Sequence, residues 1–413
     1  MTDDQLATNH SHPATCELLA PAGTQEKLKW AVAYGADAVY FGVSRFSLRS
    51  FAGNFSLDDA AEGLRYLHDR GRRGYLTLNI YPFSDEYDSL LETAGALAEM
   101  GADAFIVADL GVVTLLRAAF PNVPLHISTQ SNTVSAQAAL AYAGLGARRV
   151  NLARELSLPQ IRESVRLIAG AIETEVFIHG SVCFSYSGRC AISDYLTGRR
   201  ANRGECTQSC RWNYALMEET RPGEYFPVFE DERGLFLFNS KDLALYRYVQ
   251  PLVTAGVTSL KLEGRMKNAH YLAAVVSLYR RLLDGEVIPE ETIRTLLSRV
   301  SNRGYSEGFM KGEISDEDYQ RDFGGYHFSA IVIAHTSEQT IAGGRVCVVN
   351  NTITSGETLE LLTPDGRVCP YTLPTPLHTV EGEELPVAQN HHRLVLDGGL
   401  PAYAILRRVQ EER

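Results

Sequence analysis

The sequence of 413 residues predicts an α/β protein: a (β/α)8 TIM-like barrel with a cysteine-rich insertion after its seventh strand, followed by a small C-terminal all-β barrel domain. Three observations lead to this prediction. Short apolar runs alternate with helix-like segments from Cys16 to Gly264, four cysteines interrupt the alternation, and helical periodicity disappears after Tyr326. An open, doubly wound sheet is the alternative arrangement of the same elements.

Eight apolar runs of strand length would form the wall of the barrel. They are Glu17–Ala20, Ala38–Gly42, Tyr75–Ile80, Ala104–Ala108, Leu125–Ser128, Arg149–Ala153, Glu175–His179 and Ser259–Glu263. Helix-like segments lie between them, among them Gln25–Tyr34, Leu57–Arg70, Tyr87–Met100 and Ser135–Gly144. The spacing from strand to strand suits βαβ units, in which consecutive strands run parallel.

The interval from His179 to Ser259 is much longer than the others. It holds the clustered cysteines and a predicted hairpin, in which Tyr214–Leu216 pairs with Tyr225–Phe229. We therefore predict that residues 181–239 are inserted after strand seven, and that a helix over Leu243–Ala255 leads to strand eight.

The predicted domain limits follow from these changes of pattern. Residues 1–13 would be a flexible tail, residues 14–320 the barrel, and residues 325–413 the all-β domain. Alternating runs and turn residues mark that last domain. The runs are Ser329–Ala334, Arg345–Val349, Thr358–Leu362 and His392–Leu396.

Composition narrows the class of protein. Hydrophobic residues make up 45% of the chain, and no apolar run is long enough to span a bilayer. The polar start of the chain lacks the pattern of a secretory signal, so we expect a cytoplasmic protein without membrane partners. The net charge of −11 does not by itself favour a nucleic-acid partner, but phosphate contacts depend on local charge, and Arg199, Arg200 and Arg203 form a basic cluster.

Four of the seven cysteines, Cys183, Cys190, Cys206 and Cys210, lie within one short segment. An odd total without a secretory signal argues against a disulfide framework, and clustered thiols in a reducing compartment indicate a metal site. Their spacing, C-x6-C-x15-C-x3-C, is wider than the paired spacing of most zinc sites. It favours an iron–sulfur cluster, with structural zinc as the alternative, because thiolates bind both.

Polar residues also gather at the predicted carboxyl ends of the strands, where barrel enzymes carry their active sites. Cys183 follows strand seven closely, which would place the metal site at the same rim. The other residues at this rim are Asn79, Ser128, Gln130, Arg154, Glu155, Lys261, Glu263 and Arg265.

The segment Glu175–Ser193 resembles the signature of peptidase family U32, the collagenase-like peptidases. The matching residues are Glu175, Phe177, Gly180, Cys183, Gly188, Cys190 and Ser193. Other segments are similar to the branch of this family that hydroxylates tRNA uridine at C5. These are Glu17–Gly23, Asp37–Gly42, Ser128–Gln130, Leu152–Glu155, Tyr195–Gly198, Ala201–Trp212, Asn239–Leu243, Ser259–Lys267 and, more weakly, Gly356–Glu360. Where relatives often carry a histidine after strand three, this chain has Phe83.

The resemblance implies an enzyme that converts the wobble uridine of tRNA to 5-hydroxyuridine. It also implies prephenate as co-substrate and a 4Fe–4S cluster on the four cysteines. A dicarboxylate needs cationic partners, and we expect them among Arg49, Arg154, Lys261 and Arg265. The candidate proton-transfer residues are His179, Glu155 and Glu263. The anticodon loop would contact the basic cluster, with Trp212 or Tyr195 stacking on a flipped base.

Other functions stay open at this point. One is a peptidase, as the family name suggests, although the sequence contains neither a G-x-S-x-G nor an H-E-x-x-H motif. Another is hydroxylation of ribosomal RNA or of a quinone precursor. A third is a non-enzymatic barrel, held together by zinc, that binds RNA.

Overall fold

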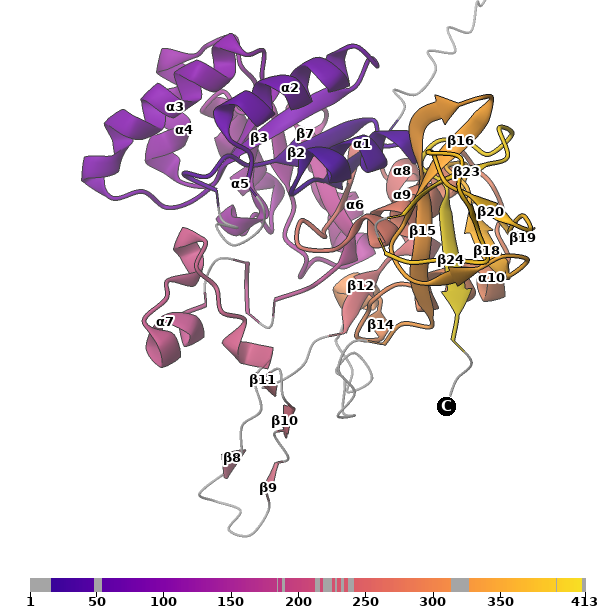
Figure 1. The fold of residues 1–413 in the computed structure, drawn as a ribbon. Coiled ribbons are helices and arrows are strands. Elements are labelled where there is room, and N and C mark those ends of the chain that lie inside the picture. The colour runs from indigo at the N-terminus through magenta and orange to yellow at the C-terminus, as the bar shows by residue number, and fades with distance from the viewer. Residues whose placement is uncertain are drawn as a thin grey trace, which may run out of the picture.

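The computed structural model describes residues 16–47, 54–183, 185–187, 190–211, 216–217, 225–226, 229–231, 234–236, 241–312, 327–390 and 392–410. Two units meet along one side (Figure 1). An α/β unit runs from indigo to salmon, and an antiparallel β unit is drawn in orange and yellow. The segment after β7, drawn in pink, lies below the α/β unit in this view.

Eight parallel strands form a closed barrel, as predicted. They are β1 (Glu17–Pro21), β2 (Ala38–Phe41), β3 (Arg73–Leu78), β4 (Ala104–Val107), β5 (Leu125–Ile127), β6 (Arg149–Asn151), β7 (Glu173–Gly180) and β13 (Ser259–Leu262). Each strand pairs with the next, and β13 pairs with both β1 and β7. The β13–β7 pairing closes the sheet, which rules out the open doubly wound arrangement.

Helices cover the outside of the barrel, and several of them begin at a polar cap. Thr24 caps α1, Asp109 caps α4 and Asn268 caps α9 through side-chain oxygens that accept backbone N–H groups. The helices are α1 (Gln25–Ala33), α2 (Leu57–His68), α3 (Tyr87–Glu99), α4 (Leu110–Ala119), α5 (Ala136–Gly144), α6 (Leu158–Ile168), α8 (Val249–Thr254), α9 (Ala269–Leu283) and α10 (Glu290–Ser298).

One predicted element is wrong in part. The segment Leu243–Ala255 was expected to be helical throughout, but it begins with strand β12 (Asp242–Ala244) and only later forms α8. β12 pairs antiparallel with the end of β7 and parallel with β14 (Tyr305–Ser306). The cause is tertiary: Asp242 is buried and lies 2.5 Å from Arg303, so the chain enters the core here as an extended strand.

The cysteine-rich segment follows β7 as predicted. It contains α7 (Ile192–Thr197), η3 (Ala201–Arg203) and η4 (Ser209–Arg211). The predicted hairpin is found as β8 (Leu216–Met217) paired antiparallel with β9 (Tyr225–Phe226), and β10 (Phe229–Asp231) pairs with β11 (Gly234–Phe236). The first residues of the predicted hairpin lie outside the described residues.

The C-terminal unit is all-β, as predicted. Its main sheet has the order β19-β18-β24-β15-β16-β23 and is antiparallel throughout. These strands are β15 (Ala330–Ile341), β16 (Gly344–Val349), β18 (Thr358–Leu362), β19 (Val368–Thr372), β23 (Arg393–Leu396) and β24 (Ile405–Val409). The described strands give no pairing between β19 and β23, so closure into a barrel stays a prediction.

A hydrogen bond links the α/β unit to the C-terminal unit. The hydroxyl of Tyr34, the residue after α1, donates this hydrogen bond to the carbonyl of Tyr403 at 2.7 Å. The predicted tail and the predicted boundary near residues 320–325 lie outside the described residues. Within the described chain, no helix has the length and apolar character needed to cross a membrane.

Candidate functional site

A cavity of about 110 Å³ opens at the carboxyl ends of the barrel strands. The cysteine segment forms one side of it and the strand ends form the rest. Its lining residues are Tyr40, Thr77, Asn79, Ile106, Ser128, Thr129, Gln130, Arg154, Phe177, Cys183, Tyr186, Ser187, Cys190, Ala201, Cys206, Lys261, Glu263 and Arg265. Several residues predicted for the site therefore line the same cavity: three of the four cysteines, the cations Arg154, Lys261 and Arg265, and the carboxylate Glu263.

A chain of buried charges lies at the floor of this cavity. The Lys261 ammonium lies 2.8 Å from the Glu175 carboxylate and 4.5 Å from the centre of the Tyr40 ring. Arg149 is paired with Glu17 on the far side of Glu175. Burial raises the pKa of Glu175, but the positive charges of Lys261 and Arg149 outweigh it and bring this pKa to about 2. Burial in turn lowers the pKa of Lys261.

The two arginines of the cavity are held by different parts of the chain. Arg154 donates to the carbonyl of Ser181 at 2.9 Å, and its guanidinium lies 4.1 Å from the centre of the Phe177 ring. Its Nε is buried and has no hydrogen-bond partner among the described residues. Arg265 donates to Ser47 at 2.7 Å and to Asn54 at 2.8 Å. Arg154 therefore has a donor left for a ligand.

The wall at the end of β5 is made of hydrogen-bonded polar side chains. Asn79 donates through Nδ2 to Oε1 of Gln130 at 2.7 Å, and the Ser128 hydroxyl lies 3.2 Å from the same oxygen. These three residues were predicted only as separate strand ends. The structure joins them into one rigid wall.

The cysteine segment supplies thiols of suitable chemistry for a cluster. Cys183, Cys190 and Cys206 line the cavity, and Cys210 lies in η4, which packs on α7. None of the four forms a disulfide. In the part of the chain that the structure describes, no three or more His, Cys, Asp or Glu side chains are arranged closely enough to hold a metal ion. The donor set and its location therefore fit a metal or cluster, while the ligands are not gathered around one point.

Of the two candidate carboxylates, only Glu263 lines the cavity. Its backbone N–H donates to the carbonyl of His179 at 2.8 Å. Gly180 has φ +112°, and a Cβ there would come within 2.6 Å of the Glu263 carbonyl oxygen. Glycine at position 180 thus allows the two strand ends to approach. Glu155 follows β6 beside the cavity, and burial raises its pKa.

The structure does not place His179 in the cavity. Its side chain is buried between the rings of Tyr271, Tyr279 and Tyr305, at 5.4 to 5.8 Å between ring centres. Burial lowers the pKa of His179 to about 3, so the ring is neutral at ordinary pH. His179 does not occupy the expected position at the mouth, because the pairing of β7 with β13 shifts its register between Phe177 and His179, so that His179 lies opposite Leu262 and does not continue the inward row of Glu175 and Phe177.

Arg203 connects the cysteine segment to the barrel. It forms two hydrogen bonds with the Glu86 carboxylate, at 2.6 and 2.9 Å, and its guanidinium lies 4.2 Å from the centre of the Phe83 ring. These hydrogen bonds hold the pKa of Glu86 below its usual range. Arg199, Arg200 and Tyr195 are exposed nearby, and Tyr195 is 89% exposed. Arg49 and Trp212 lie outside the described residues.

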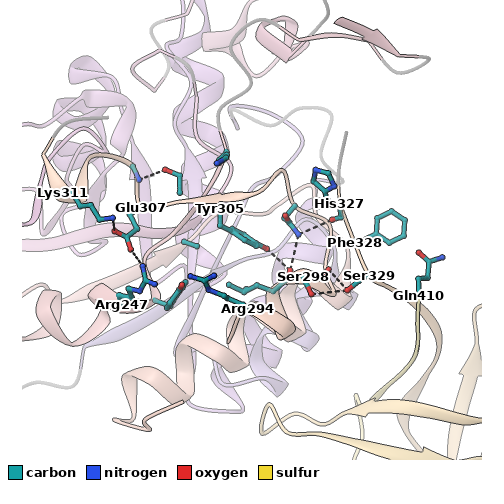
Figure 2. Close-up of a pocket in the computed structure, with 17 residues that line it drawn as sticks. Arg247, Arg294, Ser298, Tyr305, Glu307, Lys311, His327, Phe328, Ser329 and Gln410 are labelled. Carbon is teal, nitrogen blue, oxygen red and sulfur yellow. Dashed lines mark hydrogen bonds and ion pairs between the residues drawn. The ribbon is translucent and has the colours of Figure 1, made fainter. Parts of the chain in front are cut away.

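A larger cavity, of about 920 Å³, lies between β12, β14, α10 and the start of β15. Figure 2 shows Arg247, Glu307 and Lys311 at one end of it and His327, Phe328 and Ser329 at the other. Among the described residues that line it, the basic side chains Lys241, Arg247, Arg294 and Lys311 outnumber the acidic ones. Arg247 and Lys311 both pair with Glu307, at 2.6 and 2.9 Å. Arg294 pairs with Glu290 at 2.6 Å. In this cavity Arg247, Arg294 and Lys311 are therefore each held by a carboxylate.

Sequence reasoning missed some residues of the mouth. Glu175, Tyr40 and Phe177 were treated as parts of motifs or strands, yet they surround Lys261. An acidic residue at the start of an apolar strand is a weak signal for a buried carboxylate. Only closure of the barrel brings it to the cavity floor.

Comparison with known proteins agrees with this architecture. A family model described as peptidase family U32 matches residues 23–320. The tRNA hydroxylation protein P of Escherichia coli (strain K12) is 36% identical, and the match covers 90% of this chain and 91% of that protein.

Two further relatives carry different names. The 23S rRNA 5-hydroxycytidine C2501 synthase of Escherichia coli (strain K12) is 38% identical over 71% of this chain and 42% of that protein. A collagenase of Porphyromonas gingivalis (strain ATCC BAA-308 / W83) is 30% identical over 72% of this chain and 74% of that protein. Since the family model covers most of the barrel and the first relative matches nearly the whole chain, this protein belongs to peptidase family U32.

Proposed function

We propose that this chain is an RNA hydroxylase, and that it converts the wobble uridine of tRNA to 5-hydroxyuridine at the barrel mouth. The observation that carries the proposal is the meeting of three thiols and three cations in one cavity at the carboxyl ends of the strands. Two of the relatives, including the one that matches nine tenths of both chains, have names that concern hydroxylation of RNA. The names of the relatives support hydroxylation of RNA, and the cavity supplies thiols that could hold a redox-active metal and cations that could bind an anionic co-substrate.

Cys183, Cys190, Cys206 and Cys210 are the residues that would hold a 4Fe–4S cluster. When bound, the cluster would supply electron transfer, which oxidation of a uracil C5–H bond requires and which side chains do not provide. Arg203 supports this role indirectly. Its hydrogen bonds to Glu86 fasten the cysteine segment to the loop after β3, at the edge of the cavity.

The cations of the cavity would bind the co-substrate, which we take to be the dicarboxylate prephenate. Arg154 has a buried Nε without a partner among the described residues, and Lys261 presents its ammonium at the cavity floor. The planar guanidinium of arginine can bind one carboxylate through two parallel hydrogen bonds, and the compact ammonium of lysine can pair with the other. Arg49, predicted for the same task, stays a prediction.

The remaining groups would move protons and hold the RNA. Hydroxylation at C5 is a two-electron oxidation in which the co-substrate would be the oxidant and take up the two electrons, while the C5 hydrogen leaves as a proton. Glu263 is the carboxylate that lines the cavity and would accept that proton. Glu155, whose pKa burial raises, would exchange that proton with solvent. The exposed Arg199 and Arg200 would contact phosphates of the anticodon loop, and the exposed Tyr195 ring would stack on a base.

The test is nucleoside analysis of tRNA from a strain that lacks this gene. We expect 5-hydroxyuridine and its derivatives to disappear, and to return with the wild-type gene but not with Cys190→Ser. Cys369→Ser is the matched control, because Cys369 is an exposed cysteine of the C-terminal sheet and should restore them fully. Unchanged hydroxyuridine in the deletion strain would refute the proposal.

Two further measurements separate the alternatives. Anaerobically purified protein should contain iron and sulfide, and stoichiometric zinc instead would refute the cluster. Loss of a hydroxylated nucleoside from ribosomal RNA, with tRNA unaffected, would move the substrate to the ribosome. Proteolysis that survives Cys190→Ser would favour the peptidase.

A further inference from the structure

The Gln130 side chain ends in a donor that the described protein does not use. Gln130 is 1% exposed and lines the mouth cavity. Its Nε2 is buried and has no hydrogen-bond partner among the described residues, and the same holds for the hydroxyl of its neighbour Thr129. A buried donor without a partner is costly, so two such groups side by side in a cavity wall indicate a polar ligand.

The orientation of the Gln130 amide is set by its neighbours. Its Oε1 accepts from Asn79 Nδ2 at 2.7 Å and from the Ser128 hydroxyl at 3.2 Å. Ser128 Oγ in turn accepts the backbone N–H of Gln130 at 3.3 Å, which leaves its own hydrogen for Oε1. With the oxygen occupied on the wall side, only the NH2 group is offered to a ligand.

The backbone at Gln130 is equally fixed. Its carbonyl accepts from the Tyr81 hydroxyl at 3.0 Å and from Asn132 Nδ2 at 2.8 Å. The side chain therefore starts from a rigid turn, η2 (Thr129–Ser131), and ends in a clamped amide. Such preorganisation is what a residue that discriminates between ligands requires.

We propose that Gln130 selects uracil over cytosine by donating a hydrogen bond from Nε2 to the O4 carbonyl of the base. The proposal rests on the proposed function, because it assumes that a pyrimidine enters this cavity. The two bases differ at position 4, where uracil presents an acceptor and cytosine an amino donor. Cytosine would set donor against donor in a buried site, which is a strong means of rejection. The Thr129 hydroxyl can accept from N3–H of uracil and so completes the recognition.

The test reverses the hydrogen-bonding character of the wall while keeping its shape. In Gln130→Glu a carboxylate replaces the amide. In Asn79→Asp the new carboxylate accepts from the Gln130 NH2 group and turns the amide oxygen toward the cavity. The probes are two anticodon stem–loop RNAs that differ only in uridine or cytidine at the target position. Binding and hydroxylation of both are measured with the purified holoenzyme.

We expect both variants to lose at least about 10-fold of the preference for uridine over cytidine, which is about 1.4 kcal/mol. Ser131→Ala is the control: this residue lies in the same turn but donates to the carbonyl of Ala108, and its replacement should leave the preference unchanged. Thermal unfolding verifies that each variant is folded.

The outcomes separate this inference from the proposed function. Unchanged preference in both folded variants, with wild-type activity on uridine, would overturn the role of Gln130 and leave the proposed function standing. A wild-type protein that neither binds nor modifies either RNA would overturn both.

Discussion

At the scale of single residues, the interior of the barrel is unusual for the charges it buries. Glu175 and Lys261 are 3% and 5% exposed, and each is the other's main counter-charge. Burying two ions is costly, so this pair is poorly explained by stability alone. Its position at the cavity floor explains it better, because the carboxylate holds the ammonium where a ligand can reach it.

Glu175→Gln should destabilise the protein by about 3–5 kcal/mol, because it leaves the Lys261 ammonium buried without its counter-charge. Urea unfolding near neutral pH measures the loss. The control is Glu163→Gln, which removes an exposed ion pair with Arg166 and should leave the free energy of unfolding almost unchanged. Equal effects of the two substitutions on the free energy of unfolding would contradict the role of Glu175 as the counter-charge of Lys261.

Because its pKa is lowered by burial, His179 makes the free energy of unfolding decrease as the pH falls. Its pKa is about 3 in the folded protein, and about 6.5 in an unfolded chain. Between these values only the unfolded state takes up the proton. The stabilising effect of the neutral ring is therefore complete above about pH 6.5 and is lost as the pH falls toward 3, by about 1.4 kcal/mol per pH unit.

His179→Gln should reduce the slope of the free energy of unfolding against pH by that amount between about pH 6 and pH 4. Urea unfolding at several pH values would measure this slope. The buried His126 and His270, whose pKa values burial also lowers, should contribute to the slope that remains. An identical slope in wild type and variant would show that His179 is protonated in the folded state.

At the scale of elements, the end of β7 decides the shape of the site. The chain leaves the barrel here, starts the cysteine segment and returns through β12, which pairs with the last two residues of β7. Gly180 permits this crowding, since its positive φ and its contact with the Glu263 carbonyl leave no room for a side chain.

Gly180→Ala should therefore cost more than an ordinary glycine replacement. Gly170→Ala is the matched control, because Gly170 also has a positive φ, +78°, but nothing lies within 4 Å of its added Cβ. We expect about 1 kcal/mol for the control, from the backbone conformation alone. Gly180→Ala should cost about 1–3 kcal/mol more, from the clash. Urea unfolding of the two variants provides the comparison, and equal costs would argue against close packing of β7 on β13.

At the scale of the whole molecule, residues of the C-terminal sheet pack into the hydrophobic core of the barrel. Leu362 and Ile405 belong to the same buried cluster as the barrel helices. Arg407 is 1% exposed and pairs with Glu360 at 3.0 Å, while its Nη1 lies 2.9 Å from His270 of α9. These contacts predict that the two units unfold together.

Glu360→Gln should lower the stability of both units, by about 2 kcal/mol, because it leaves the buried Arg407 without its carboxylate while Glu360 itself is partly exposed. Calorimetry should give one unfolding transition for wild type and variant, shifted to lower temperature in the variant. Two separated transitions would mean that the units are thermodynamically independent.

Much of this organisation follows from local sequence. All eight barrel strands, the position of the cysteine segment and the all-β texture of the last unit were predicted, because apolar periodicity and turn residues act over short distances. The partial failure at Leu243–Ala255 has the opposite cause. Its first residues form β12 because Asp242 pairs with Arg303, far along the chain.

The same division holds for the site. The sequence by itself determined which residue types stand at the strand ends and which thiols stand together, since both are properties of neighbouring positions. Only the tertiary structure decided which of them share a cavity. The register shift between β7 and β13 placed His179 away from the mouth, and closure of β13 on β7 placed Glu175 beneath the Lys261 ammonium. Such choices depend on contacts between segments far apart in the chain, which no local pattern encodes.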